Sequence, residues 1–342
     1  MKPHLGLVNT KHLEALCMWL DAHLDMAWAA VQGRDLTTPC PDRSQAALSL
    51  PDLAEGDVRY AFATIFTDPP SPQMIATNTD EEIRNWCHET GLEQLAIYEK
   101  LEREGHIRIV RSTSDLDVSC NCLSIVLLME GADPIRQPDE VSWWFERGLR
   151  VVGLTWAMGS RYAGGNAQSH PLTDEGRALI AALDEYKIVH DLSHLADPAV
   201  DELLSLSQGR VIASHSNARH FIPGNERHIQ DAHIKEISNR NGVIGLNLFS
   251  QFLTPNRRAR VADCIDHISH ICSVMGHHQG CGLGSDLDGD FTPTQMPEGL
   301  DHPSKYGALS QALRQRGWSA SDIRGFEHAN WLNFLRSALP NN

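Results

Sequence analysis

The sequence is poor in positive charge and has no long apolar run. Its 29 lysine and arginine residues are outnumbered by 44 aspartate and glutamate residues, so the formal net charge is −15 with histidine neutral. That balance argues against a nucleic-acid partner and an anionic membrane surface, because both attract basic proteins. No apolar stretch approaches the length of a membrane span, and residues 1–10 lack the regions of a signal peptide. We therefore expect a cytoplasmic protein with no membrane or nucleic-acid partner.

The eight cysteines do not form a metal-finger or redox motif. Cys120 and Cys122 are separated by one residue, which is too close for the usual zinc or redox spacing. Several other cysteines lie within apolar runs, where a free thiol behaves as a small apolar side chain. The chain also lacks internal repeats, low-complexity tracts and an interdomain linker. We expect a reducing compartment and a single domain over residues 1–342.

What the chain does contain is eight short apolar runs, separated by segments that mostly have helical character. The runs are residues 15–20, 58–66, 123–129, 150–156, 187–192, 210–214, 241–248 and 281–285. Near-continuous apolar strands that alternate with helices predict a parallel sheet covered on both faces. Eight such units in one chain fit a (β/α)8 barrel of the α/β class better than an open sheet. Long loops at about 31–57, 67–78 and 286–303 are expected near the active face.

Several helix boundaries can be read from capping residues. Thr79 with Glu82 three residues later predicts a capping box for a helix that ends at about Glu104. Thr173 precedes an amphipathic stripe of apolar residues. Ser319 begins the last helix, whose apolar side chains would pack on the barrel.

Side chains able to bind a metal follow five of the apolar runs, at the end where barrel enzymes carry their active sites. They are His23, Asp25, Glu130, Asp191, His194, His215, Asp286 and Asp288. Taken singly, His194 can begin a helix, His215 can cap one, and Asp286 with Asp288 can form an Asx turn. Glu130 directly follows an apolar strand, where burial is costly unless the carboxylate is paired or bound to a cation. Because the ordinary explanations would all have to coincide, we favour a metal site.

The number of candidate ligands favours two cations. One catalytic zinc is usually held by three protein side chains, and this set is larger and includes a carboxylate able to bridge. Two cations lower the pKa of a shared water and polarise a carbonyl oxygen. A spare carboxylate such as Asp286 can then carry the proton from the water to a leaving amine. The predicted chemistry is hydrolysis of an amide or an electronically similar bond.

The order of these motifs resembles the renal (membrane) dipeptidases, peptidase family M19 of the amidohydrolase-like barrels. The matching segments are residues 21–25, 128–135, 191–194, 213–219, 282–289 and 330–335. The resemblance implies a metal-dependent hydrolase of the barrel type that holds two zinc ions. It further implies that a hydroxide bridging the metals attacks the amide carbonyl of a dipeptide, and that the protein is a homodimer.

The resemblance also implies roles for individual residues. The implied metal ligands are His23 and Asp25 for one zinc, His194 and His215 for the other, Glu130 between them, and Asp286 as a further ligand. Glu130 and Asp286 are the implied catalytic carboxylates. Arg227 aligns with the arginine that holds the substrate carboxylate, a task that suits a planar, bidentate donor. The alternative for Arg227 is a surface arginine at the start of a helix.

One segment departs from the family pattern. After the fourth strand the dipeptidases place a histidine that contacts the scissile carbonyl, whereas this chain has Trp156, which offers one N–H donor and does not titrate. Arg161 and Tyr162 follow, and we predict that all three bind substrate; ordinary loop packing is the alternative for Arg161 and Tyr162. The departure keeps a second hypothesis open, in which the same centre hydrolyses an N-acyl amino acid, a lactone or another small amide. A non-catalytic metal-binding protein is a third hypothesis, which the complete ligand set disfavours.

Overall fold

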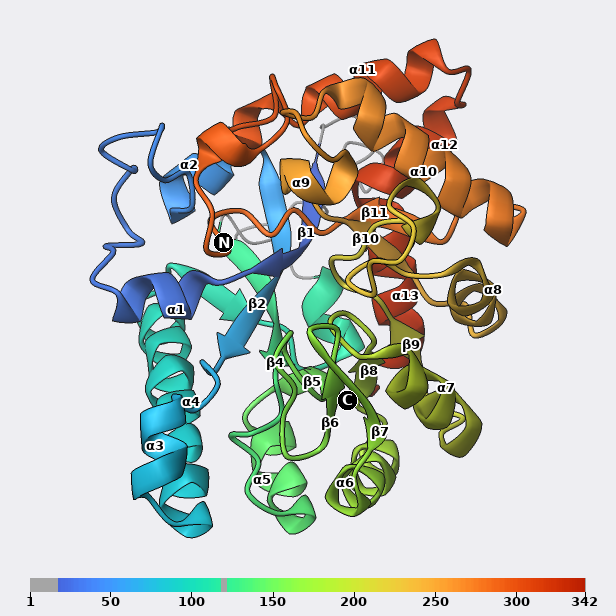
Figure 1. Ribbon diagram of the computed structural model, residues 1–342. Coiled ribbons are helices and arrows are strands. Elements are labelled where there is room, and N and C mark those ends of the chain that lie inside the picture. Colours follow the sequence, from blue (N-terminus) through green and yellow to red (C-terminus); the bar gives the residue numbers. More distant parts are fainter. Residues whose placement is uncertain (1–17, 118–121, 342) are drawn as a thin grey trace, which may run out of the picture.

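The computed structural model describes residues 18–117 and 122–341, which form a mixed α/β barrel (Figure 1). Its parallel barrel strands are β1 (Trp19–Leu24), β2 (Val58–Phe66), β4 (Leu123–Glu130), β5 (Leu149–Gly153), β8 (Val189–Asp191), β9 (Val211–Ile212), β10 (Ile244–Leu246) and β11 (Cys281–Leu283). The hydrogen-bonded order is β10-β11-β1-β2-β4-β5-β8-β9, and a bridge between Ala213 and Ile244 joins the two ends. The predicted (β/α)8 barrel is confirmed.

Helices surround the barrel and connect its strands. They are α1 (Met26–Val31), α2 (Leu50–Glu55), α3 (Pro72–Thr77), α4 (Asp80–Arg103), α5 (Val141–Glu146), α6 (Asp174–Glu185), α7 (Asp197–Leu206), α8 (Asp231–Asn239), α9 (Ser250–Leu253), α10 (Val261–Met275), α11 (Gly307–Gln315), α12 (Ala320–Arg324) and α13 (Asn330–Ala338). The predicted capping box of Thr79 and Glu82 begins α4, and Thr173 caps α6. The predicted last helix is divided, because a π-helical segment at Gly325–Ala329 separates α12 from α13.

Each of the eight apolar runs overlaps a barrel strand, but the first strand is displaced toward the C-terminus. β1 begins at Trp19, near the end of the run 15–20, of which residues 15–17 lie outside the described part of the chain. His23 therefore belongs to the strand, and Asp25 follows it as the N-cap of α1. The displacement arises because buried polar residues interrupt the apolar pattern here. The pairing of β1 with β2 also changes register over this stretch, an irregularity that re-aims side chains.

Three short strands lie outside the eight runs. β3 (Ile107–Ile109) pairs with the start of β4. β6 (Ala163–Gly165) and β7 (Gln168–Leu172) form an antiparallel hairpin between β5 and α6. Trp156, where the sequence departs from the dipeptidase pattern, lies in the loop between β5 and this hairpin.

The barrel interior is filled by apolar side chains and closed by the C-terminal helix. Leu20, Phe62 and Val126 belong to one buried cluster that also includes Trp331 of α13. The Trp331 ring lies 5.1 Å from the Phe62 ring, and its Nε1 donates to the carbonyl of Leu283 at 3.0 Å. A packed interior of this kind leaves the strand ends at the opposite rim to carry the functional side chains.

The three predicted loops contain short helices. The contacts of one aspartate connect two of these loops. α2 lies within 31–57 and α3 within 67–78. Asp288, in the loop after β11, accepts hydrogen bonds from the backbone N–H groups of Ala47 and Leu48 at 3.0 and 2.9 Å and pairs with Arg34 at 2.5 Å. Asp288 is thus a structural anchor, which corrects its inclusion among the candidate metal-binding residues.

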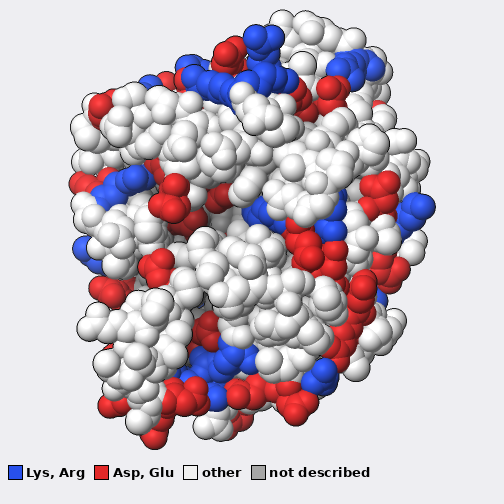
Figure 2. Space-filling model, viewed as in Figure 1, with Lys and Arg blue, Asp and Glu red and all other residues white. Residues whose placement is uncertain are grey.

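The surface and the cysteines bear on the predicted location. Figure 2 shows acidic side chains gathered in and around a hollow near the middle of this face, with basic ones beside them. Among the described helices, none combines the length and apolar character needed to cross a bilayer. Cys40, Cys87, Cys264, Cys272 and Cys281 are free and buried. Cys122 is disulfide-bonded, which a reducing compartment does not explain.

Candidate metal centre

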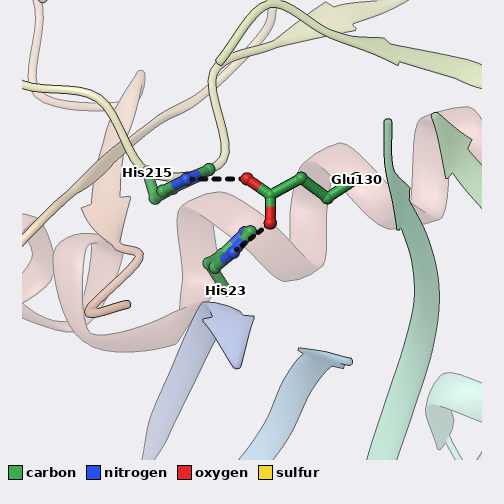
Figure 3. Close-up of side chains that lie close together, drawn as sticks. All are labelled: His23, Glu130 and His215. Atoms are coloured by element: carbon green, nitrogen blue, oxygen red, sulfur yellow. Dashed lines mark ion pairs between the residues drawn. The ribbon is translucent and has the colours of Figure 1, made fainter. Parts of the chain in front are cut away.

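The six predicted metal ligands converge at one rim of the barrel. They are His23 of β1, Asp25 directly after it, Glu130 at the end of β4, and His194, His215 and Asp286 in the loops after β8, β9 and β11. All six are largely buried. Figure 3 shows Glu130 reaching between His23 and His215, which approach it from different elements.

The two oxygens of Glu130 face different histidines. Oε1 lies 3.2 Å from Nε2 of His194 and 3.4 Å from Nε2 of His215, and those two nitrogens are 3.0 Å apart. Oε2 lies 3.3 Å from Nε2 of His23. Ligand atoms about 2.0–2.2 Å from a tetrahedral zinc are separated by about 3.3–3.6 Å. The spacing therefore matches ligands that share cations, with Glu130 in the bridging position.

Two further carboxylates complete the side of the cluster that faces His23. Nε2 of His23 lies 3.7 Å from Oδ1 of Asp25 and 3.9 Å from Oδ1 of Asp286, and these three residues form a group whose ligand atoms all lie within 4.8 Å. Among the described residues, His23 Nε2 and Glu130 Oε1 are buried and have no hydrogen-bond partner. Unsatisfied buried groups are costly, and bound cations would satisfy both. The residues present thus fit a pair of divalent metal ions.

A serine fixes the orientation of two of the histidines. Ser214 Oγ donates its one proton to Oδ2 of Asp191 at 2.5 Å, so it accepts from Nδ1 of His215 at 2.7 Å and from Nδ1 of His23 at 3.4 Å. A neutral ring that carries its proton on Nδ1 presents an unprotonated Nε2 to the cluster, which is the form that binds a metal ion. The sequence offered Asp191 as a candidate ligand. In the structure its carboxylate instead accepts from the serine that orients two candidate ligands.

The cluster perturbs the pKa values of its own members. Burial opposes the charged form of His23, but the carboxylates of Glu130, Asp25 and Asp286 outweigh it and raise its pKa to about 10. Burial, with help from the neighbouring carboxylates, raises the pKa of Asp286 to about 7 and that of Asp25 to about 6. Such a concentration of carboxylates suits divalent cations.

Asn247 is a functional residue that the sequence reasoning missed. It follows β10, and its Nδ2 donates to Oδ2 of Asp286 at 2.8 Å. Its own Oδ1 accepts from the backbone N–H of Phe249 at 2.7 Å, which fixes the orientation of the amide. Oδ1 of Asp286 is thereby left to face the cluster. The available signal was a polar residue within the apolar run 241–248.

Arg227 lies beside the cluster and is not a surface residue. Its side chain is buried, with Nη1 donating to Ser216 Oγ at 3.2 Å and Nη2 to the carbonyl of His215 at 2.8 Å. Its Nε has no hydrogen-bond partner among the described residues. A buried guanidinium with an unused donor next to a metal site is suited to hold a carboxylate.

The aromatic ring of Trp156 lies next to one of the candidate histidine ligands. Its ring centroid lies 5.9 Å from that of His194 and 5.7 Å from that of Phe66. The side chain is half-buried. This position allows the indole to contact a molecule held at the cluster.

Arg161 and Tyr162 do not join the cluster. Nε of Arg161 pairs with Asp133 at 3.2 Å, and the buried hydroxyl of Tyr162 donates to the carbonyl of Ile135. A buried hydroxyl that is already hydrogen-bonded to the main chain has no free face for a substrate. The structure therefore favours the packing alternative for both residues, and their role in binding substrate stays a prediction.

Comparison with known proteins agrees with these features. The family described as membrane dipeptidase (peptidase family M19) matches residues 8–340. Dipeptidase tcpJ of Claviceps purpurea is 25% identical over 326 residues, which cover 92% of this chain and 74% of that protein. Dipeptidase aclJ of Aspergillus oryzae is 29% identical over 220 residues, which cover 62% of this chain and 51% of that protein. The chain thus spans about half the length of the Aspergillus relative.

Two solved structures share the fold. A metallo peptidase from Rhodobacter sphaeroides, liganded with a phosphinate mimic of the dipeptide L-Ala-D-Ala, superposes with a TM-score of 0.81 at 24% identity and covers 94% of this chain and 99% of that chain. The probable dipeptidase PvdM from Pseudomonas aeruginosa superposes with a TM-score of 0.82 at 17% identity and covers 96% and 97%. Both similarities extend over nearly the whole barrel.

Proposed function

The chain belongs to the membrane dipeptidase family, peptidase family M19, and from that premise we propose that it is a zinc-dependent dipeptidase with two metal ions per chain. The observation that supports this most directly is the position of Glu130, whose two oxygens face separate histidine sites. His23, Asp25 and Asp286 would hold one ion, and His194 and His215 the other. When bound, the ions lower the pKa of a shared water and polarise the scissile carbonyl oxygen.

The protein's own groups would then move the proton and orient the substrate. Oδ1 of Asp286 faces the cluster because Asn247 occupies Oδ2, so this oxygen is placed to accept a proton from the attacking water. It would pass the same proton to the nitrogen of the leaving amine. Arg227 would bind the substrate's terminal carboxylate through its unused Nε–H group.

A dipeptide assay of zinc-loaded protein tests the proposal. Ala-Ala stereoisomers are suitable first substrates, because the Rhodobacter protein of the same fold is liganded with a mimic of L-Ala-D-Ala. We expect hydrolysis that is lost after chelation and restored by zinc. A His215→Ala variant is the matched inactive control, because it removes one ligand and leaves the other candidates in place. Turnover that survives complete metal removal would contradict the proposal.

Trp156 supports a second candidate function at the same centre. An indole in place of a histidine removes a titratable group from the position expected to contact the scissile carbonyl, and losing one such donor can cost on the order of 100–1,000-fold in turnover. The alternative substrates are N-acyl amino acids, lactones or other small amides. A panel that compares kcat/KM for dipeptides with kcat/KM for these compounds separates the two functions.

A further inference from the structure

The β6–β7 hairpin packs its turn against the segment that carries His194. The backbone N–H of Asn166, at the turn, donates to the carbonyl of His194 at 2.9 Å, and the N–H of Ala196 donates to the carbonyl of Gly164 at 3.0 Å. Gly165 and Leu195 form an antiparallel bridge between these two hydrogen bonds. The hairpin therefore fixes the backbone on both sides of a candidate metal ligand.

The backbone of His194 needs such support. Its φ is 64°, in the left-handed region that a side chain with a Cβ rarely adopts. Strain of this kind persists only where the surrounding structure holds it. The two main-chain hydrogen bonds and the bridge from the hairpin are contacts of that type.

The two glycines of the hairpin allow this close approach. A Cβ at Gly164 would collide with the backbone of His170, and a Cβ at Gly165 would collide with the carbonyl oxygens of Trp156 and Ala157. Together with the contacts of Arg161 and Tyr162 described above, these close approaches account for the packing of the segment 161–166.

The side chain of Asn166 makes the contact that matters for metal binding. Its Oδ1 lies 3.0 Å from Nδ1 of His194. Because an amide oxygen only accepts, Nδ1 must carry the proton, and the neutral ring then presents an unprotonated Nε2. That Nε2 faces His215 and Glu130 at 3.0 and 3.2 Å.

We propose that Asn166 is a positioning residue, which holds His194 in the tautomer and orientation needed to bind a metal ion. The inference rests on the proposed two-metal centre and extends it to a residue outside the ligand set. Removing a group that hydrogen-bonds the other ring nitrogen of a histidine ligand typically weakens metal binding by about 10–100-fold. The hairpin is thus part of the metal site, although it contributes no ligand.

The test compares zinc retention by the Asn166→Leu variant, the Asn166→Asp variant and the unaltered protein. Leucine keeps the approximate volume and removes the acceptor, so we expect one of two zinc ions to bind about 10–100-fold more weakly. Aspartate restores an acceptor, so both ions should be retained. Gln168→Ala, an exposed change in the same hairpin, is the control and should bind two ions. Cobalt substitution adds a spectroscopic readout, because the visible absorption of the affected site should change in Asn166→Leu alone.

The outcomes separate this inference from the proposed function. If Asn166→Leu retains both ions with unchanged affinity and an unchanged cobalt spectrum, the positioning role is wrong and the two-metal centre stands. If the untouched protein binds no zinc, the proposed function itself fails, and the inference with it. Unfolding measurements on the metal-free proteins show whether the leucine substitution destabilises the fold. A large loss of stability there, repeated in Asn166→Ser, would assign Asn166 to structure and overturn the inference.

Discussion

The two carboxylate oxygens of Asp286 make different contacts, and its proposed role in proton transfer depends on this difference. Oδ2 accepts from Asn247 at 2.8 Å, and Oδ1 lies 3.9 Å from His23 Nε2 at the edge of the cluster. Oδ1 is therefore the oxygen that faces the cluster. The backbone φ of Asp286 is 61°, so the chain is held in an unfavourable conformation at this residue.

The variant Asp286→Asn tests the proton transfer. An amide cannot accept the proton, so we expect kcat for a dipeptide to fall by about 100–10,000-fold with a much smaller change in KM. Metal analysis of the same sample shows whether the ions remain. An Asp286→Asn enzyme with normal kcat would remove Asp286 from the mechanism.

The variant Arg227→Met tests recognition of the substrate carboxylate. Losing the charged partner of a buried ion pair costs about 2–5 kcal/mol, so kcat/KM for a dipeptide should fall on the order of 100-fold. A dipeptide amide, which lacks the carboxylate, is the control substrate and should lose little further activity. Equal losses for the acid and the amide would show that Arg227 serves another purpose.

At this scale the sequence predicted the candidate ligands but not the residues that orient them. Histidines and carboxylates at strand ends have a chemical signature, and all six were placed together by the fold. Asn166, Asn247 and Ser214 act through other residues. A neutral amide or hydroxyl in a loop has no signature of its own, because its role depends on a neighbour distant in the sequence.

At the scale of elements, one buried histidine of α10 connects this helix to the end of α9 and to the loop after β9. Nδ1 of His267 accepts from the backbone N–H of Ala218 at 3.1 Å, and Nε2 lies 3.0 Å from the carbonyl of Leu253, to which it donates. Burial is the largest cause that lowers the pKa of His267, to about 4. Protonation would place a second N–H group against the N–H of Ala218.

This histidine predicts a loss of stability in mild acid. Its folded-state pKa lies below the unfolded value of about 6.5, so the unfolded chain binds more protons between these values. The contribution is present above about pH 6.5 and is lost as the pH falls toward 4. The free energy of unfolding, measured with urea, should therefore fall between pH 7.5 and pH 5. This fall should be smaller in His267→Gln than in the unaltered protein by on the order of 2 kcal/mol. The exposed His106→Gln is the control, and identical pH dependence in all three proteins would refute the assignment.

Elements were predictable where a pattern of apolar residues or caps exists. The run 58–66 and the cap at Thr79 correspond closely to β2 and the start of α4. The β6–β7 hairpin was not predicted, because Ala163–Gly165 has neither apolar alternation nor β-branched residues. Its conformation depends on close backbone packing against residues 194–196, which no local pattern records.

At the scale of the whole molecule, the closed barrel was predictable from the count of apolar runs, whereas the residues that close it were not. Closure between β9 and β10 rests on the isolated bridge of Ala213 with Ile244. Trp331 fills the interior next to β11, where a Cβ at Gly282 would collide with its Nε1. The homodimer implied by the resemblance stays a prediction.

The variant Gly282→Ala tests this packing. Overfilling a close-packed core typically costs about 1–3 kcal/mol, so the free energy of unfolding should fall by that amount while zinc binding persists. Gly307→Ala is the matched control, because a Cβ there meets no atom within 4 Å. Equal stability of Gly282→Ala and the unaltered protein would show that the core relaxes around the added methyl group.

Zinc-edge anomalous diffraction from crystals of the zinc-loaded protein is the most direct test of the metal centre. We predict two peaks roughly 3.5–4 Å apart, one beside His23 and one between His194 and His215, with Glu130 contacting both. A single peak, or none at these side chains, would contradict the two-metal mechanism.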